Sequence, residues 1–366
     1  MIPSRPPGSA ADPARRTFVG LLLVAVAVWV GRARAQWFVA DEWAFLAQRD
    51  AASLDGLFAP HQEHWVTLPV IGYRILWNLV GLQSYKPYLA AALALPLAVV
   101  GALRAVLRRA GVGPWIATAS ATVLLFYGTG SENIVWGFMV TFTGALALGL
   151  LQFLVADQPG SSWRRDLACF ACGLGAVMCS GVGLIMVGVV GLALLLRRGM
   201  WAALRSTMPT LAAYAVWRST FGADARTPTG DARAIARFAG RGLTTALASV
   251  TPHLVVSVAL VLLVGLGLVL MARAPATSFA QLRFDLAFPV AAALGAVGFY
   301  LVVGRSRSVF FGLDYAPRGR FLYVAVVLLL PLVAVSADAV ARRWPQATVP
   351  VVLVLLAGVP ANVDAI

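Results

Sequence analysis

The stretch FVGLLLVAVAVWV (Phe18–Val30) has no charged or polar side chain and predicts a helix in the hydrocarbon core of a membrane. The rest of the chain is similar: of its 366 residues, 60% are apolar and 12% charged, and the mean hydropathy is +0.83. Soluble domains are about 45–50% apolar and about 25% charged. The composition therefore excludes a water-soluble globule, a disordered chain and a fibre, and it predicts a polytopic membrane protein.

Ten further apolar runs are expected to cross the membrane, and the first run is interpreted as an uncleaved span because no cleavage site leads into a soluble domain. The ten runs are residues 87–107, 114–130, 134–155, 167–181, 182–196, 203–217, 246–271, 286–303, 321–340 and 347–362. The predicted fold is therefore all-α: a polytopic integral membrane protein with about eleven transmembrane helices in one domain, residues 1–366, and no separate soluble domain. The short pair at 167–196 is alternatively a re-entrant hairpin.

Arginine clusters set the expected orientation. The net charge is +14, from 29 basic and 15 acidic residues. The clusters fall on one side of the predicted topology, which the positive-inside rule makes cytoplasmic. They lie at residues 104–109, 164–165, 197–205, 273–283 and 342–343. We expect a multi-pass protein of the inner (plasma) membrane with a cytoplasmic N-terminus, membrane lipids as partners and no nucleic acid partner.

One predicted connection, the extracytoplasmic loop at residues 32–86, is much longer than the others. It carries five of the fifteen acidic residues and two of the three histidines. Long loops in compact proteins are usually functional or disordered, and the many aromatic and leucine residues argue against disorder. Within it, LPVIGYRILWNLVGL (Leu68–Leu82) places Ile71, Ile75 and Leu79 at helical spacing, which predicts an amphipathic helix lying in the membrane interface.

The first candidate for chemistry is the pair Asp41 and Glu42, ten residues beyond the first span. A partly desolvated carboxylate has a raised proton affinity, so the pair is a candidate general base or cation ligand. The alternative is an acidic residue that only caps the helix following it.

The second candidate is the run His61-Gln62-Glu63-His64-Trp65. Its spacing differs from HExxH, in which two histidines one helical turn apart bind zinc. His61, Glu63 and His64 are candidates for a divalent cation site or for orienting a substrate hydroxyl. The alternative is a polar interfacial loop anchored by Trp65.

The third candidate is GRSRSVFFGLDYAPRGRFLY, which begins at Gly304 and is expected to form an extracytoplasmic arginine-rich loop at residues 304–320. Its four arginines are Arg305, Arg307, Arg318 and Arg320. They run against the positive-inside rule, so an anionic partner is expected. Guanidinium groups bind phosphate through two parallel hydrogen bonds, which suits a lipid phosphate, and the alternative is snorkelling to phospholipid head groups.

A weaker candidate is Glu132, in the turn Ser131–Asn133 between two predicted spans. An ionisable side chain at the membrane edge is a functional candidate by default. A simple turn residue explains it nearly as well.

In combination, these motifs resemble the GT-C superfamily of membrane glycosyltransferases, which use polyprenyl-phosphate-linked sugars. The resemblance extends over nearly the whole chain and is closest to a bacterial branch with an E-H-W motif in the first extracytoplasmic loop. It rests on the acidic pair, on PHQEHW followed by LPVIGYRILW and GLQSYKPY, on GSENIVWGFMVTF and on the late RGRFLY. Many GT-C enzymes end in a soluble domain, whereas this chain stops at Ile366, so we expect either a truncated product or a partner subunit.

The resemblance implies a role for each candidate residue. Asp41 would be the catalytic base with Glu42 beside it, and the arginines, Arg318 and Arg320 above all, would bind the donor phosphate. The residues that would line the acceptor or cation site are His61, Glu63, His64, Trp65 and Glu132.

The expected function is a hexosyl or pentosyl transfer from a polyprenyl-phosphate donor to an extracytoplasmic glycan, lipid or protein acceptor. Mg²⁺ or Mn²⁺ is an optional cofactor. The alternatives are a transporter or flippase for a lipid-linked or anionic solute, and a non-catalytic subunit of a glycan-assembly complex. Transporters often contain internal repeats with broken helices, and the sequence contains no such repeat.

Overall fold

The computed structural model describes residues 11–50, 52–160, 162–223, 228–273 and 278–366. Over these residues the chain is helical and has no strand, in agreement with the predicted all-α class. The first half contains α1 (Ala11–Ala33), α2 (Asp41–Ala47), α3 (Leu54–Phe58), α4 (Thr67–Val80), α5 (Lys86–Arg109), α6 (Pro114–Leu125), η1 (Gly128–Gly130), α7 (Glu132–Val135), η2 (Gly137–Met139), α8 (Val140–Ala156) and α9 (Trp163–Val177). The second half contains α10 (Val182–Arg198), α11 (Met200–Thr220), α12 (Ala232–Ala248), α13 (Leu254–Arg273), α14 (Phe279–Phe310), η3 (Leu313–Tyr315), α15 (Gly319–Arg343), η4 (Pro345–Ala347), α16 (Thr348–Leu356) and α17 (Val359–Asp364).

Seven helical segments of the described chain are long and apolar enough to cross a membrane. They are Pro13–Ala33, Lys86–Arg109, Gly137–Ala156, Leu254–Arg273, Phe279–Phe310, Gly319–Arg343 and Pro345–Asp364. These segments support a membrane-embedded protein. The remaining four expected spans are also helical, as α6, α9, α10 and α11, but they are shorter or less apolar, so the number of eleven spans stays a prediction.

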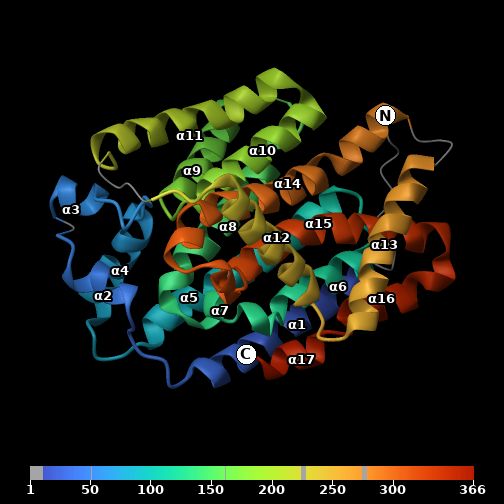
Figure 1. The fold of residues 1–366 in the computed structure, drawn as a ribbon, viewed down its shortest axis with the longest axis horizontal. Helices are drawn as coiled ribbons and strands as arrows, with labels where there is room; N and C mark the ends of the chain where they lie inside the picture. The colour runs from blue at the N-terminus through green and yellow to red at the C-terminus, as the bar shows by residue number, and fades with distance from the viewer. Residues whose placement is uncertain (1–10, 51, 161, 224–227, 274–277) are drawn as a thin grey trace.

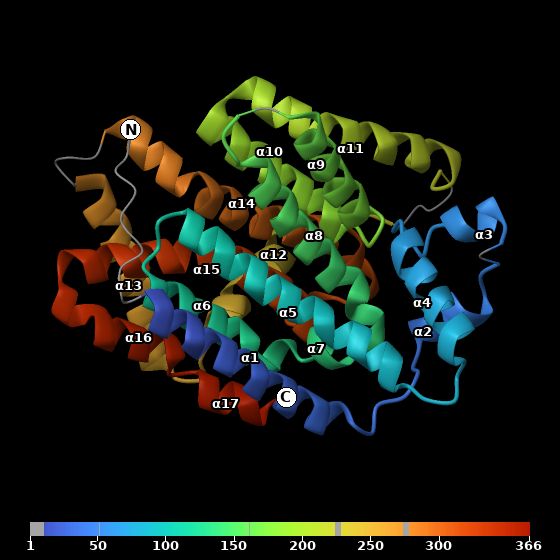
Figure 2. The same ribbon diagram turned by 180° about the vertical axis from the view of Figure 1, so that it is seen from behind.

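The helices pack around α15 (Figures 1 and 2). In α15, 78% of the most apolar stretch is buried, whereas in α13 only 6% is, so α13 turns its apolar surface outward. Hydrogen bonds of buried side chains tie distant segments to this core. Asp338 of α15 accepts a 2.7 Å hydrogen bond from the backbone N–H of Gly113 before α6, and Asn362 of α17 accepts one from Thr129 in η1.

Two predicted boundaries are wrong. The span expected at 246–271 is divided, because α12 ends at Ala248 and α13 begins at Leu254. Helix α14 continues to Phe310, so the arginine-rich segment 304–320 is a loop only after that residue. The expected span at 347–362 lies within the spanning segment Pro345–Asp364, which is made up of η4, α16 and α17.

The long segment 32–86 forms α2, α3 and α4, which lie together at one end of the bundle (Figures 1 and 2). The expected helix at 68–82 is present as α4. It buries Val70 and Tyr73 against the protein, while Ile75 and Leu79 of its apolar stripe are 53% and 74% exposed. The apolar stripe of α4 is thus available to a membrane interface, as the sequence predicts. The polar N-terminal residues 1–10 lie outside the described residues.

Candidate functional site

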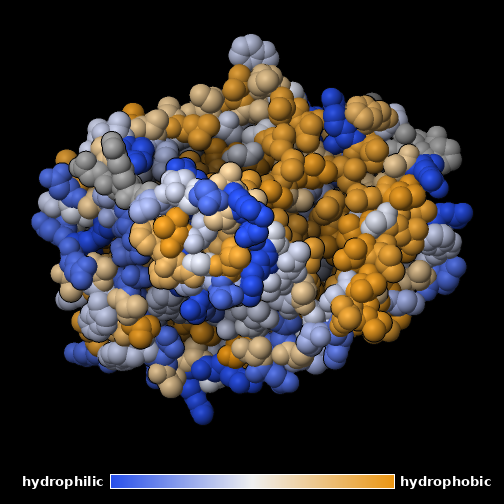
Figure 3. Space-filling model, in the orientation of Figure 1, coloured by the Kyte–Doolittle hydropathy of each residue, from blue (hydrophilic) through white to orange (hydrophobic). Residues whose placement is uncertain are grey.

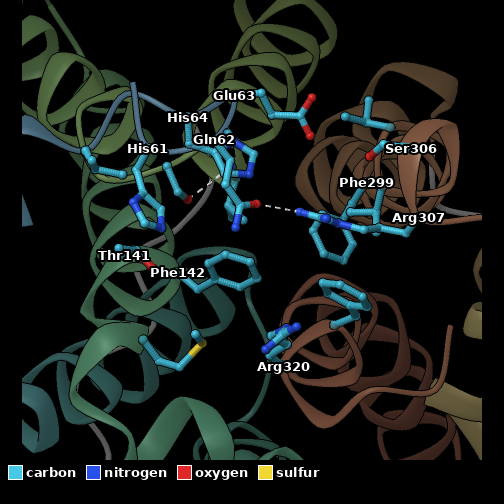
Figure 4. A pocket seen from close by; sticks show the side chains of 18 of the residues that line it. His61, Gln62, Glu63, His64, Thr141, Phe142, Phe299, Ser306, Arg307 and Arg320 are labelled. Atoms are coloured by element: carbon cyan, nitrogen blue, oxygen red, sulfur yellow. Dashed lines mark hydrogen bonds between the residues drawn. The ribbon is translucent and has the colours of Figure 1, made fainter. Parts of the chain in front are cut away.

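A cavity of about 290 Å³ lies where the segment 32–86 meets α8, α10, α14 and the start of α15 (Figure 4). Its polar side chains are Asp41, His61, Gln62, Glu63, His64, Thr141, Ser180, Ser306, Arg307, Tyr315 and Arg320. Its apolar side chains include Phe142, Ile185, Phe299, Val302, Val303 and Phe321. The cavity therefore combines acids, histidines and arginines with an extended apolar wall.

The PHQEHW segment enters this cavity as a tight two-residue turn. His61 and His64 exchange backbone hydrogen bonds of 2.9 and 3.0 Å, which leaves Gln62 and Glu63 at the tip. Gln62 has a φ of +54°, a conformation that side chains other than glycine rarely adopt. The strained turn points the histidine rings and the Gln62 side chain into the cavity (Figure 4).

Asp41 and His61 form the polar pair at one side of the cavity. His61 Nε2 lies 3.5 Å from Asp41 Oδ1, and the Asp41 side chain is 37% exposed. The hydrogen bond and charge of His61, with the charges of Arg320 and Arg307, lower the pKa of Asp41 despite its partial burial. The expected rise in the proton affinity of this residue is therefore wrong: Asp41 is an ionised carboxylate at neutral pH. It begins α2 and is not its N-cap, which is Ala40.

Glu42 does not reach the cavity, although it follows Asp41 directly. Its carboxylate is fully buried and accepts hydrogen bonds from the hydroxyls of Tyr73 (2.6 Å) and Tyr85 (3.0 Å) and from the backbone N–H of Val39 (3.1 Å). Burial raises the pKa of Glu42. Glu42 thus joins α2 to α4 and α5 and positions Asp41, and its geometry does not support a catalytic role.

Replacing Glu42 should destabilise the fold. Glu42→Ala leaves two buried tyrosine hydroxyls without an acceptor, at about 1–3 kcal/mol for each unsatisfied group. We expect a clearly lower melting temperature for the purified protein in detergent, and a smaller loss for Glu42→Gln, which keeps an acceptor for the tyrosines. Asp55→Ala, an exposed acid in α3, is the control. Equal melting temperatures for Glu42→Ala and the unaltered protein would contradict the positioning role.

Two of the four predicted arginines line the cavity. Arg307 donates a 2.8 Å hydrogen bond from Nη2 to Oε1 of Gln62, across the cavity from α14 (Figure 4). Arg320 donates a hydrogen bond to the hydroxyl of Tyr315, and its Nη1 lies 3.6 Å from Oε2 of Glu132. Glu132 therefore holds Arg320 from outside the cavity and does not line it.

The other two arginines lie outside the cavity. Arg305 is exposed, and its Nη2 is 3.5 Å from the hydroxyl oxygen of Thr229. Arg318 is exposed and packs its guanidinium 5.0 Å from the centre of the Tyr315 ring. The geometry therefore does not support the prediction of phosphate binding by Arg305 and Arg318.

Trp65 is also outside the cavity, despite its place in the PHQEHW run. It is buried, stacks on Trp217 with ring centres 5.1 Å apart, and donates a 2.7 Å hydrogen bond to the hydroxyl of Thr67. These contacts anchor the turn to α11 within the protein. Trp65 is neither a substrate contact nor an exposed interfacial anchor in this arrangement.

His64 and Glu63 complete the polar side of the cavity. Burial lowers the pKa of His64 to about 4, so its imidazole is neutral at pH 7. Among the residues that the structure describes, no three His, Cys, Asp or Glu side chains converge as the ligands of a metal ion. The positive charge inside the cavity comes from Arg307 and Arg320.

Several cavity residues were not predicted from the sequence. Gln62 lies inside the quoted histidine run and Thr141 inside GSENIVWGFMVTF, but no chemistry was assigned to either. Ser180 lies between α9 and α10, at the turn of the hairpin expected at 167–196. A polar residue at the turn of a membrane hairpin is a signal that could have identified Ser180 as a cavity residue. Ser306 lies inside the quoted arginine-rich motif, but no chemistry was assigned to it, and Phe299 carries no signal because it lies in an ordinary apolar stretch of α14.

Comparisons of the chain with protein-family models, with curated proteins and with solved structures returned no match. The assignment of a function therefore rests on the chemistry of the cavity.

Proposed function

We propose that this protein is a membrane glycosyltransferase of the GT-C type, which transfers a sugar from a polyprenyl-phosphate donor to a hydroxyl of an extracytoplasmic glycan, lipid or protein. One observation carries the proposal: the ionised Asp41, held by His61, shares a cavity with Arg307 and Arg320 and with an apolar wall. A base, a phosphate site and an apolar surface are the three features that an isoprenoid-linked sugar donor requires.

The proposed reaction is a single displacement with inversion. Asp41 accepts the proton of the acceptor hydroxyl while the hydroxyl oxygen forms a bond to the anomeric carbon. The bond from that carbon to the phosphate oxygen breaks, and polyprenyl phosphate leaves with the electron pair. Arg307 and Arg320 stabilise the charge that develops on the leaving phosphate, and their fixed positions make this stabilisation effective.

The apolar wall supports a lipid-linked donor over a soluble nucleotide sugar. Phe142 and Ile185 come from α8 and α10, and Val302 and Val303 come from α14. These helices belong to the apolar bundle, and their side chains give the cavity an apolar surface suited to an isoprenoid chain. A nucleotide base and ribose would need hydrogen-bonding partners that this wall lacks.

The pH dependence of transfer should reveal the Asp41–His61 pair. Asp41 acts as a carboxylate, and His61 lowers its pKa, so the pair keeps the base ionised to a lower pH. His61→Phe keeps a ring against Phe45 and Phe138 but removes the hydrogen bond. We expect the acid limb of the pH profile of kcat/KM to move to higher pH. His253→Phe, at an exposed histidine before α13, should leave it unchanged, and an unshifted limb in His61→Phe would exclude the pair as the base.

A transporter or flippase for the same solutes is the competing function. The test uses purified protein in liposomes with a panel of polyprenyl-phosphate hexoses and pentoses. Glycosyltransferase activity predicts release of polyprenyl phosphate with formation of a new glycoside. Movement of intact donor between leaflets without release would overturn the proposal.

A further inference from the structure

Helix α12, which the sequence analysis did not identify, has two chemically opposite faces. Asp231 caps its start by accepting a 2.7 Å hydrogen bond from the backbone N–H of Ala234. Phe238, Ala239 and Gly242 form its buried face, where Gly242 lets the Tyr300 ring approach the backbone. The exposed face carries Arg233, Arg237 and Arg241 at intervals of four residues, a spacing that aligns them in one stripe.

The arginine stripe lies at the membrane boundary. Nη2 of Arg241 is 2.9 Å from Oδ1 of Asp314, which belongs to the connection between the apolar helices α14 and α15. A connection between two spanning helices marks the level of the lipid head groups. Within the described residues, Arg233 and Arg237 have no hydrogen bond or ion pair. Arg233 and Arg237 therefore present unneutralised guanidinium groups beside the Arg241–Asp314 pair, where lipid phosphates lie.

An apolar groove begins one helical turn beyond Arg241. Its volume is about 530 Å³, and it lies between α12, α13 and α15. Thr244 stands at its rim, with its hydroxyl donating a 2.8 Å hydrogen bond to the carbonyl of Gly240, and Leu247 lines the groove beyond it. Figure 3 shows a hydrophilic ridge in the region of α12 beside a hollowed hydrophobic surface in the region of α13.

The distance of the groove from the start of α15 matches one leaflet of a bilayer. The α15 residues that line it run from Leu329 to Val333, ten to fourteen residues after Gly319. At 1.5 Å per residue this is about 15–21 Å along the helix. The hydrocarbon core of a bilayer is about 30 Å thick, so one leaflet contributes about 15 Å. An acyl chain of that leaflet fits this length, whereas a partner's spanning helix would need a groove along the whole of α15.

From this juxtaposition we infer that the groove binds one anionic phospholipid, with its phosphate on Arg237, beside the Arg241–Asp314 pair, and an acyl chain between α12 and α13. Guanidinium groups bind phosphate through parallel hydrogen bonds. The aliphatic lining buries the acyl chain through the hydrophobic effect, which requires no specific contact. The site is separate from the cavity that contains Asp41 and shares no lining residue with it. The inference does not rest on the proposed function.

The test measures lipid retention by native mass spectrometry of the full-length protein, purified in detergent and supplied with defined lipids. Phosphatidylglycerol and phosphatidylcholine with identical chains separate the charge of the head group from the chain. We expect one bound phosphatidylglycerol, with about tenfold weaker retention of phosphatidylcholine, because the choline ammonium cancels the net negative charge of its head group and is repelled by the arginines. The double variant Arg237→Gln with Arg241→Gln should remove this preference, and Leu247→Trp should block the groove to both lipids.

Arg343→Gln is the matched control, because it changes an exposed arginine at the opposite end of α15 and should leave retention unchanged. The exposed arginines of α12 contribute no buried packing, so the double variant tests the site even where Leu247→Trp fails to fold. Equal retention of the two lipids by the unaltered protein, or unchanged preference in the double variant, would overturn the inference. A dimer that excludes lipid and dissociates on Leu247→Trp would assign the groove to a second copy of the chain.

Discussion

Asp41→Asn should reduce glycosyl transfer by about 10²–10⁴, the usual contribution of a positioned general base. The substitution keeps the size of the side chain and leaves its neighbour Glu42 in the hydrogen bonds that fix α2. An amide cannot accept the proton of the acceptor hydroxyl, so the loss should lie in kcat, with little change in donor binding. The measurement is the initial rate of glycoside formation by purified protein in liposomes, together with the affinity for polyprenyl phosphate.

The control for this change is Asp55→Asn, which alters an exposed acid of the same long segment outside the cavity. It should retain the full rate. Transfer at the unaltered rate by Asp41→Asn would assign the base to Glu63, the other acid that lines the cavity. A parallel loss of melting temperature in Asp41→Asn would show that the carboxylate supports the fold instead of the reaction.

The membrane helices could be predicted because the length and hydropathy of a run are local properties of the sequence. The predicted helix boundaries were wrong where one apolar run contained parts of two helices, and where a helix continued past the end of its apolar run. Residues 246–248 are apolar enough to continue into α13, but they belong to α12, whose apolar side packs on α14 and α15. The seven residues after Val303 were predicted to form a loop because this stretch contains two arginines and two serines, but they continue α14 to Phe310.

The kinds of residue in the site could be predicted from the sequence. Which of two neighbouring arginines or acids lines the cavity could not. Residues two apart on a helix point about 200° from each other, so once α14 extends to Phe310 only one of Arg305 and Arg307 can face the cavity. Asp41 and Glu42 are adjacent at the start of α2, so their side chains point about 100° from each other and enter different surroundings. Which of the two is buried depends on Tyr73 and Tyr85, 31 and 43 residues from Glu42, and no local pattern encodes that contact.

Arg320→Ala should weaken the binding of polyprenyl phosphate in detergent by about tenfold to a hundredfold, because a hydrogen bond to a charged group contributes about 1.5–3 kcal/mol. Arg320 lines the cavity and contacts Tyr315, whereas Arg318, two residues earlier, is exposed and lies outside it. Arg318→Ala is therefore a control of equal charge and should bind the lipid normally.

The conservative variant Arg320→Lys separates specific binding from simple attraction. Lysine supplies the charge but not the planar pair of donors, so it should restore only part of the affinity if Arg320 holds the phosphate through parallel hydrogen bonds. Snorkelling to head groups predicts full rescue by lysine and equal, small effects of Arg318→Ala and Arg320→Ala. Working in detergent removes the bulk phospholipid that would compete for either arginine. Unchanged binding in both Arg320 variants would remove Arg320 from the donor site and leave Arg307, which α14 holds against Gln62, as the cavity's remaining guanidinium for the phosphate.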